Sequence, residues 1–195
     1  MTLTELLQDS NYELNQFTSD EIKRLEDKIV LKNDSKGRSI PHVQCLIRKK
    51  EIKLTPEEVV RQLFLDKLIN HYGYNPSLID VEVGINFGRE VKRADIIVYE
   101  KSNPTAQYII VELKKPKLKD GKDQLKSYCN ATGAPLGVWT NGKQISYYNR
   151  KDPNYFEDIT DIPSSTEKIA DIISERITYD DLKKIDKLQT EKKSL

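Results

Sequence analysis

The chain has 195 residues, enough for one domain with a buried core and too few for a large multidomain enzyme. Hydrophobic residues make up 37% and charged residues 32%, so the chain is polar but is expected to fold. Its 32 Lys and Arg nearly balance its 31 Asp and Glu, which gives a formal net charge of +1. Any attraction to nucleic acid therefore has to come from local clusters of charge.

The cysteines, histidines and apolar runs exclude further classes of protein. Cys45 and Cys129 cannot form a disulfide framework, and with His42 and His71 they lack the spacing of a structural zinc site. No apolar run approaches the ~20 residues that cross a bilayer, and the N-terminus lacks the basic flank and apolar stretch of a signal peptide. We therefore expect a cytoplasmic protein with no membrane partner.

Residues 1–39 are expected to form a helical extension. Thr18 and Glu21 stand at capping-box spacing before an apolar stripe, which predicts a short amphipathic helix. The turn-rich segment 33–39 separates this extension from the compact domain, which we place at residues 40–163.

A longer helix is predicted after Thr55. The Thr55 hydroxyl suits an N-cap, Pro56 suits the first helical position, and two glutamates follow in the first turn. The helix is expected to end near Gly73. Its predicted apolar face contains Val60, Leu63, Phe64 and Leu68.

The middle of the chain predicts a sheet. Segments 81–87, 93–100 and 107–115 are rich in Val, Ile and Tyr and are separated by turn signals, as is typical of strands. Helical spacing over 121–132 precedes a fourth strand at 135–140, which indicates a crossover connection. The expected fold class is α/β, with a mixed central sheet flanked by helices and helical extensions at both ends.

Asn141 and Gly142 have the signature of a two-residue hairpin turn into a strand at 144–149. Residues 137–143 also satisfy the GxxxxGK pattern of a phosphate-binding loop. Gln144 replaces the metal-binding hydroxyl of that motif, and a strand pattern follows in place of a helix. The hairpin is therefore preferred over an ATP site.

Residues 164–195 are expected to form C-terminal helices or a linker to domains absent from this chain. Isoleucines at helical spacing predict a capped helix over 164–177. The tail from Asp180 is charged on most faces and carries only a thin apolar stripe, so it resembles a helix that packs on a partner.

Two carboxylates stand out because each lies in an otherwise apolar strand. Asp95 and Glu112 are costly to bury unless something pairs with them. Lys114 shares a face with Glu112 because side chains alternate along a strand. If the two strands are neighbours with aligned ends, the three side chains meet, and two carboxylates suit Mg²⁺. The ion would polarise a phosphate oxygen, and the lysine would orient or deprotonate the attacking water.

These residues resemble a known signature. Asp95 and the Glu112-Leu113-Lys114 triplet are similar to the PD-(D/E)xK nuclease motif, and Gln124 with Tyr128 resembles the QxxxY of RecB-like nucleases. The run from about residue 40 to 150, including TPEEVVRQ, HYGY, RADIIVY and IIVELKKP, resembles the N-terminal nuclease domain of type I restriction enzyme R subunits.

The resemblance implies a restriction-endonuclease-like fold and a site for Mg²⁺ or Mn²⁺. Asp95 and Glu112 would bind the metal, Lys114 would assist the water, and Gln124 and Tyr128 would contact DNA or order the site. A helical glutamate completes a second metal site in such enzymes, and Glu58 is its best match. Glu58 also fits a capping box with Thr55, and both interpretations stay open.

Lysines crowd the segment that follows Glu112. Next to a phosphodiester-cleaving site they would meet the DNA backbone, whereas otherwise they would form a solvated loop. Arg61 and Arg93 are either further phosphate contacts or simple surface charges. The predicted DNA-binding or site-ordering residues are Gln124, Tyr128, Lys115, Lys117, Lys119, Arg61 and Arg93.

Each site residue has an ordinary structural alternative. Asp95 could be a solvated acid at a strand start, Glu112 and Lys114 a surface ion pair worth ~0.5 kcal/mol, and Tyr128 a core side chain. The joint pattern favours a Mg²⁺-dependent DNA endonuclease domain of a restriction system. The alternative function is a catalytically inactive module of the same fold that binds DNA or docks.

Domains of this kind are normally fused to larger machinery. The expected partners are double-stranded DNA, a translocase or an adenine methyltransferase, and the domains or subunits that confer sequence specificity. The chain is expected to be the excised N-terminal domain of such an enzyme.

Overall fold

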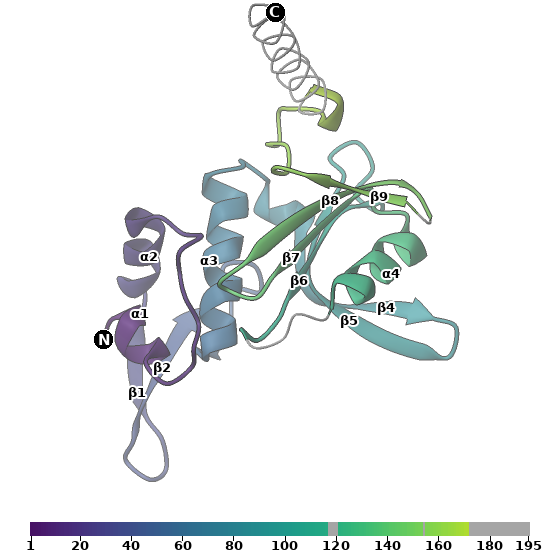
Figure 1. Cartoon of the computed structure of the whole chain (residues 1–195). Coiled ribbons are helices and arrows are strands. Elements are labelled where there is room, and N and C mark those ends of the chain that lie inside the picture. The colour runs from purple at the N-terminus through teal and green to yellow at the C-terminus, as the bar shows by residue number, and fades with distance from the viewer. Residues whose placement is uncertain (117–120, 154, 172–195) are drawn as a thin grey trace, which may run out of the picture.

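The computed structural model describes residues 1–116, 121–153 and 155–171 (Figure 1). Within these residues a six-stranded sheet has the order β4-β5-β6-β7-β8-β9. The strands are β4 (Ile79–Phe87), β5 (Glu90–Tyr99), β6 (Gln107–Leu113), β7 (Leu136–Thr140), β8 (Ile145–Asp152) and β9 (Tyr155–Ile159), with a 3-10 turn, η1 (Pro76–Leu78), before β4. Neighbouring strands are antiparallel except β6 and β7, which are parallel and joined by helix α4 (Lys122–Thr132). This confirms the predicted crossover.

Helices cover both faces of the sheet (Figure 1). Helix α3 (Pro56–Asn70) packs on one face, in an apolar cluster that includes Ile96 of β5 and Val111 of β6. Helix α4 packs on the other face, where Leu125 joins Ile97 and Ile110. Successive residues of one strand enter different clusters because side chains alternate. The predicted α/β fold with a mixed central sheet flanked by helices is confirmed.

The N-terminal region adds two short helices and a small sheet. Helix α1 (Leu3–Leu7) and helix α2 (Ser19–Glu26) pack on α3, and Arg24 of α2 pairs with Asp66 of α3 at 2.5 Å. The predicted capping box is present, since Thr18 and Glu21 make both reciprocal hydrogen bonds. The small sheet has the order β1 (Val30–Asn33), β2 (Ser39–Gln44), β3 (Glu51–Lys53).

Helix α3 is buried on both sides, which corrects the prediction of a single apolar face. Val59 and Leu65 lie outside that face, yet both are fully buried. The reason is that the sheet covers one side of α3 while α1 and α2 cover the other (Figure 1). Polar side chains of α3, among them Arg61 and Gln62, are consequently buried as well.

The turn between β7 and β8 differs by one residue from the prediction. The Asn141 N–H donates to the Gln144 carbonyl oxygen at 3.2 Å, so the central residues are Gly142 and Lys143. The Asn141 carboxamide oxygen accepts hydrogen bonds from the backbone N–H groups of Lys143 and Gln144, and these side-chain bonds shift the turn. Strand β8 follows the GxxxxGK segment, as expected of a hairpin.

The C-terminal helix begins later than predicted. Residues 165–167 form a turn, and the helix starts at Ile169; residues 172–177 of the predicted helix and the charged tail lie outside the described residues. The Ser165 N–H donates to the Tyr72 carbonyl oxygen at 2.8 Å, and the Tyr74 hydroxyl donates to the Pro163 carbonyl oxygen at 2.7 Å. These bonds hold the chain after β9 against the segment that follows α3.

The predicted boundary between residues 39 and 40 falls inside β2, which pairs with β1 on one side and β3 on the other. The division into an extension and a compact domain stays a prediction. In the part of the chain that the structure describes, no helix has the length and apolar character needed to cross a membrane.

Candidate active site

The register of β5 and β6 brings Asp95 beside Glu112. Ile96 lies opposite Val111 in this antiparallel pair, so the next residues along, Asp95 and Glu112, are cross-strand neighbours. Asp95 Oδ2 accepts a hydrogen bond from the Leu113 N–H at 2.7 Å, which fixes the carboxylate at this edge. The structure therefore brings together the acids that the sequence singled out.

Glu112 is a carboxylate in an apolar strand, and its side chain is only 3% exposed. Its Oε1 atom contacts Lys114 Nζ at 2.6 Å, whereas Oε2 is buried and has no hydrogen-bond partner among the described residues. Burial, followed by the charge of Asp95, raises the pKa of Glu112 to about 7, although Lys114 opposes this. Glu112 is therefore poised to exchange a proton or to accept a positively charged ligand.

Lys114 connects the strand edge to helix α4. Its ammonium donates to Gln124 Oε1 at 3.1 Å, Gln124 Nε2 donates to the Tyr128 hydroxyl, and this hydroxyl donates to the Arg93 carbonyl oxygen at 3.3 Å. Burial alone would lower the pKa of Lys114, but the hydrogen bond and charge of Glu112 give a net rise. Lys114 is therefore an ammonium at neutral pH.

The QxxxY residues thus reach the site by a chain of hydrogen bonds. Tyr128 is 1% exposed and belongs to the apolar cluster beneath α4, so its ring is part of the core and is not presented to DNA. Its hydroxyl still takes part in the hydrogen bonds that order the site. Gly121, with φ +95°, precedes this helix, and a Cβ there would overlap the Lys114 side chain. The missing side chain leaves room for Lys114 to lie across the helix start.

Arg61 is the charged centre that the sequence did not reveal. It is 5% exposed, so it is not a simple surface charge, and the other predicted role, a phosphate contact, stays a prediction. Its guanidinium pairs with Asp95 at 2.8 Å and with Glu57 at 3.3 Å, contacts Glu58, and approaches Glu82 at 3.6 Å. Burial lowers the pKa of Arg61, but the charges of Glu58, Asp95 and Glu82 outweigh this and give a net rise. Arg61 thereby orders the acids of the site.

Glu58 does not complete the predicted capping box with Thr55. Its carboxylate accepts hydrogen bonds from Arg61 and, at 2.8 Å, from Gln62 Nε2, and does not return a bond to the Thr55 N–H. Thr55 still caps α3, because its hydroxyl accepts from the Glu58 N–H at 3.3 Å. Within the described ranges, no group of three or more His, Cys, Asp or Glu side chains is placed to hold a metal ion. A metal role for Glu58 stays a prediction.

Glu82 is a site residue that the sequence analysis missed. The register of β4 and β5 pairs Val81 with Ile96 and Val83 with Ala94, so Glu82 lies opposite Asp95. Its φ of 55° lies in the left-handed region, which is uncommon for a residue with a Cβ. Glu82 pairs with Arg48 at 2.5 Å in addition to its contact with Arg61. The alternating pattern VEVGINF signals an outward side chain but carries no sign of this conformation.

The predicted phosphate contacts are less closely tied to the site. Arg93 is exposed on β5, the strand that carries Asp95, and Lys115 is exposed two residues after the end of β6, the strand that carries Glu112. Lys117 and Lys119 lie outside the described residues. Lys122 and Lys126, in the same basic run, lie over the rings of Trp139 and Tyr148 at 5.1 Å in each case.

The donor set fits a hard divalent cation. Glu112 Oε2 is a buried carboxylate oxygen without a hydrogen bond from the described residues, and a carboxylate has room for more than the two hydrogen bonds that Asp95 accepts here. Mg²⁺ is commonly bound by one or two carboxylates while waters and substrate phosphates complete its shell. The residues that would hold such an ion are Asp95 and Glu112.

More than half of the chain matches a known protein family. The family described as "Type I restriction enzyme R protein N terminus" matches residues 56–163, which include α3, the six-stranded sheet and α4. No curated protein matches the chain. Among solved structures, the chain is similar to a protein belonging to DUF820 from Anabaena variabilis, with 18% identity, a TM-score of 0.40, and coverage of 66% of this chain and 88% of the other.

Proposed function

Because this chain belongs to the family of type I restriction enzyme R protein N termini, we propose that it is a DNA endonuclease domain that uses Mg²⁺ or Mn²⁺ to hydrolyse phosphodiester bonds. One observation carries the proposal: Asp95, Glu112 and Lys114 converge at one sheet edge, with Glu112 Oε2 left open. A surface ion pair would leave both of its members in water, whereas Glu112 is buried here.

The proposed roles follow from charge and position. Asp95 and Glu112 hold the cation, which when bound supplies charge to polarise a phosphate oxygen and to acidify water. Arg61 and the Leu113 N–H keep Asp95 in place. Lys114 is protonated at neutral pH, so it orients the attacking water or stabilises charge that develops on the phosphate, and it does not act as a general base.

The same site supports a role within a restriction system. Arg93 is exposed on β5 and Lys115 is exposed just after the end of β6, which would allow both to contact DNA phosphates. Family membership supports double-stranded DNA as the substrate, and it supports a translocase or methyltransferase together with specificity domains as partners. We assign Gln124 and Tyr128 to the ordering of Lys114.

The proposal is tested by metal binding and by cleavage with the same proteins. Mg²⁺ and Mn²⁺ are titrated by calorimetry into the chain and into its Asp95→Asn and Glu112→Gln variants, with the exposed Glu100→Gln as the matched control. The two site variants should lose metal binding, while the control should retain it. Plasmid cleavage by the complete enzyme should be lost in the same variants and in Lys114→Ala.

Two outcomes oppose the proposal. Metal binding that is absent from the unchanged chain would favour a non-cutting module that binds DNA or docks. Cleavage that survives all three site substitutions would show that the chemistry lies elsewhere. Circular dichroism of each variant shows whether the fold is retained.

A further inference from the structure

A hollow lies next to the candidate site and takes part of its wall from the N-terminal region. Its volume is about 650 Å³. Its lining comes from three segments that are distant in sequence: the linker after α1, the start of α3, and the chain just after Lys114. The residues that matter below are Ser10, Asn11, Tyr12, Thr55, Glu57 and Lys115.

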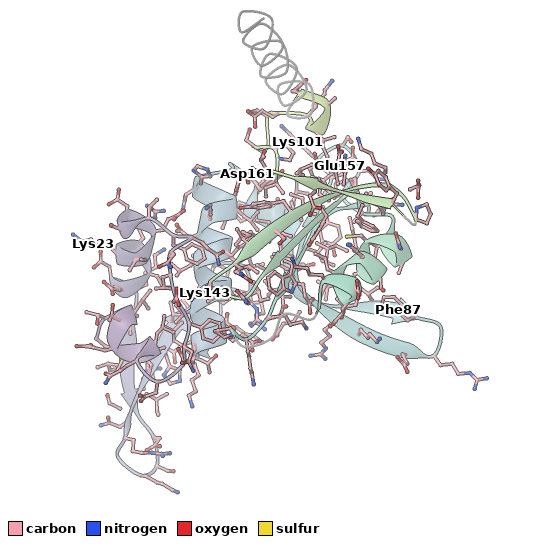
Figure 2. All side chains as sticks on the ribbon, viewed as in Figure 1. Lys23, Phe87, Lys101, Lys143, Glu157 and Asp161 are labelled. Carbon is pink, nitrogen blue, oxygen red and sulfur yellow. The ribbon has the colours of Figure 1, made fainter. Side chains whose placement is uncertain are left out.

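The linker after α1 is tied to the β7–β8 turn and to α3. The Thr140 hydroxyl donates to Gln16 Oε1 at 2.9 Å, and Lys67 Nζ donates to the Gln16 carbonyl oxygen at 3.2 Å. Glu13 pairs with Lys143 at 2.6 Å, and Figure 2 shows Lys143 at the turn that faces the N-terminal region. These contacts attach this wall of the hollow to the β7–β8 turn and to α3, and so hold the linker in a defined position.

Tyr12 is the side chain of this wall that reaches toward the site. Its ring lies over Gly142, where an added Cβ would stand 2.7 Å from Tyr12 Cδ1. Its hydroxyl is buried and has no hydrogen-bond partner in the described part of the chain. Burial, followed by the charges of Glu57 and Asp95, raises the pKa of Tyr12 to about 12. The hydroxyl therefore remains a hydrogen-bond donor at neutral pH, within electrostatic reach of Asp95.

We propose that this hollow binds the nucleotide unit adjacent to the phosphodiester bond at Asp95 and Glu112, and that the Tyr12 hydroxyl donates a hydrogen bond to that nucleotide. The inference rests on the proposed function, and it adds a binding site and a substrate-contacting residue, Tyr12, which lies outside the segment that matches the family, residues 56–163. Tyr12 is thereby a further contact to the substrate.

The chemistry of the lining suits a nucleotide. Lys115 offers an exposed ammonium to a phosphate, and its neighbour Lys114 belongs to the candidate site, so a strand bound there runs on into the hollow. Asn11 offers an amide group for a sugar or a base edge, and the Thr55 hydroxyl accepts from the Glu58 N–H but keeps its own hydrogen to donate. The volume of about 650 Å³ lies within the range of about 300–1,000 Å³ typical of small-ligand sites.

The test compares Tyr12→Phe with Tyr155→Phe in the 195-residue chain. The first variant keeps the ring over Gly142 and removes only the hydroxyl, and the second removes the hydroxyl of an exposed tyrosine on β9. Thymidine 3′,5′-bisphosphate is titrated into each protein while backbone amide NMR signals are followed. The amides of Ser10, Asn11 and Thr55 should shift in the unchanged chain.

Loss of one hydrogen bond should raise the Kd of Tyr12→Phe by about three- to tenfold. Tyr155→Phe should keep the original Kd. A duplex oligonucleotide should displace the bisphosphate from the hollow, because the proposed occupant is part of a DNA strand. An unchanged Kd in Tyr12→Phe, unshifted amides around the hollow, or bisphosphate that stays bound at saturating duplex would each overturn the inference.

The metal titration described above distinguishes a failure of the inference about Tyr12 from a failure of the proposed function. Binding of Mg²⁺ that depends on Asp95 and Glu112, with no nucleotide in the hollow, would remove only the inference about Tyr12. Absence of that metal binding would remove the proposed function first.

Discussion

Glu112 should make the stability of this protein depend on pH in a way that one substitution removes. Its pKa is about 7 in the folded chain against an ordinary value of 4.5. Between these values the folded chain keeps the proton while the unfolded chain releases it, so stability falls as pH rises through this window. Each pKa unit corresponds to about 1.4 kcal/mol, which gives a loss of roughly 3 kcal/mol by pH 8.

Glu112→Gln cannot lose a proton and should escape this loss. The free energy of unfolding is measured by urea denaturation at pH 5, 6, 7 and 8 for the unchanged chain and the variant. The variant should gain roughly 3 kcal/mol relative to the unchanged chain from the lowest to the highest pH. Groups that titrate in both proteins cancel in this difference.

The matched control is Glu100→Gln, an exposed glutamate at the end of β5. Its stability difference from the unchanged chain should stay within about 0.5 kcal/mol at every pH. A difference between Glu112→Gln and the unchanged chain that does not vary with pH would refute the reasoning, because it would mean that Glu112 is ionised throughout. In that case Lys114 would lower the pKa of Glu112 by as much as burial and the charge of Asp95 raise it.

The same carboxylate should couple Mg²⁺ affinity to pH, since the ion competes with the proton: calorimetry should show about tenfold tighter binding at pH 8 than at pH 6, and equal affinities would contradict the role of Glu112. Arg61→Ala should lower the free energy of unfolding by about 3–5 kcal/mol in urea, because Glu58 and Asp95 lose a buried partner; a change below about 1 kcal/mol would mean that water replaces the guanidinium. Gly121→Ala should slow plasmid cleavage, with Gly37→Ala, at another positive φ but in open space, as the control for backbone strain.

The local signals in the sequence correctly located most elements near the site. The capping box of Thr18 and Glu21 is present, and the helix at 121–132 and the parallel crossover occur where periodicity and turn residues indicated. Asp95 and Glu112 were also found from the sequence, because an acid in an apolar strand stands out against its neighbours. Each of these features depends on a few adjacent residues or on a repeating spacing.

The errors have one origin. Arg61 was predicted to be a phosphate contact or a surface charge, yet it is buried against strands β4 and β5, where Glu82 and Asp95 bind its guanidinium. Glu58 has a capping pattern with Thr55, but a buried arginine one turn away binds its carboxylate more effectively than a backbone N–H does. Tyr12 carries no local signal, since its hydroxyl meets the site only through the packing of residues far from it in the chain.

By itself, the sequence determined the α/β class, the order of strands and helices along the core, and the identity of the acid, acid and lysine at the candidate site. These follow from hydrogen bonding and apolar periodicity, which act over a few residues. Only the tertiary structure decided which charges are partners, that Glu112 keeps one oxygen open, and that Tyr12 lies beside the site. Such pairings depend on which distant segments exclude water together, and burial sets the free energy of each charge.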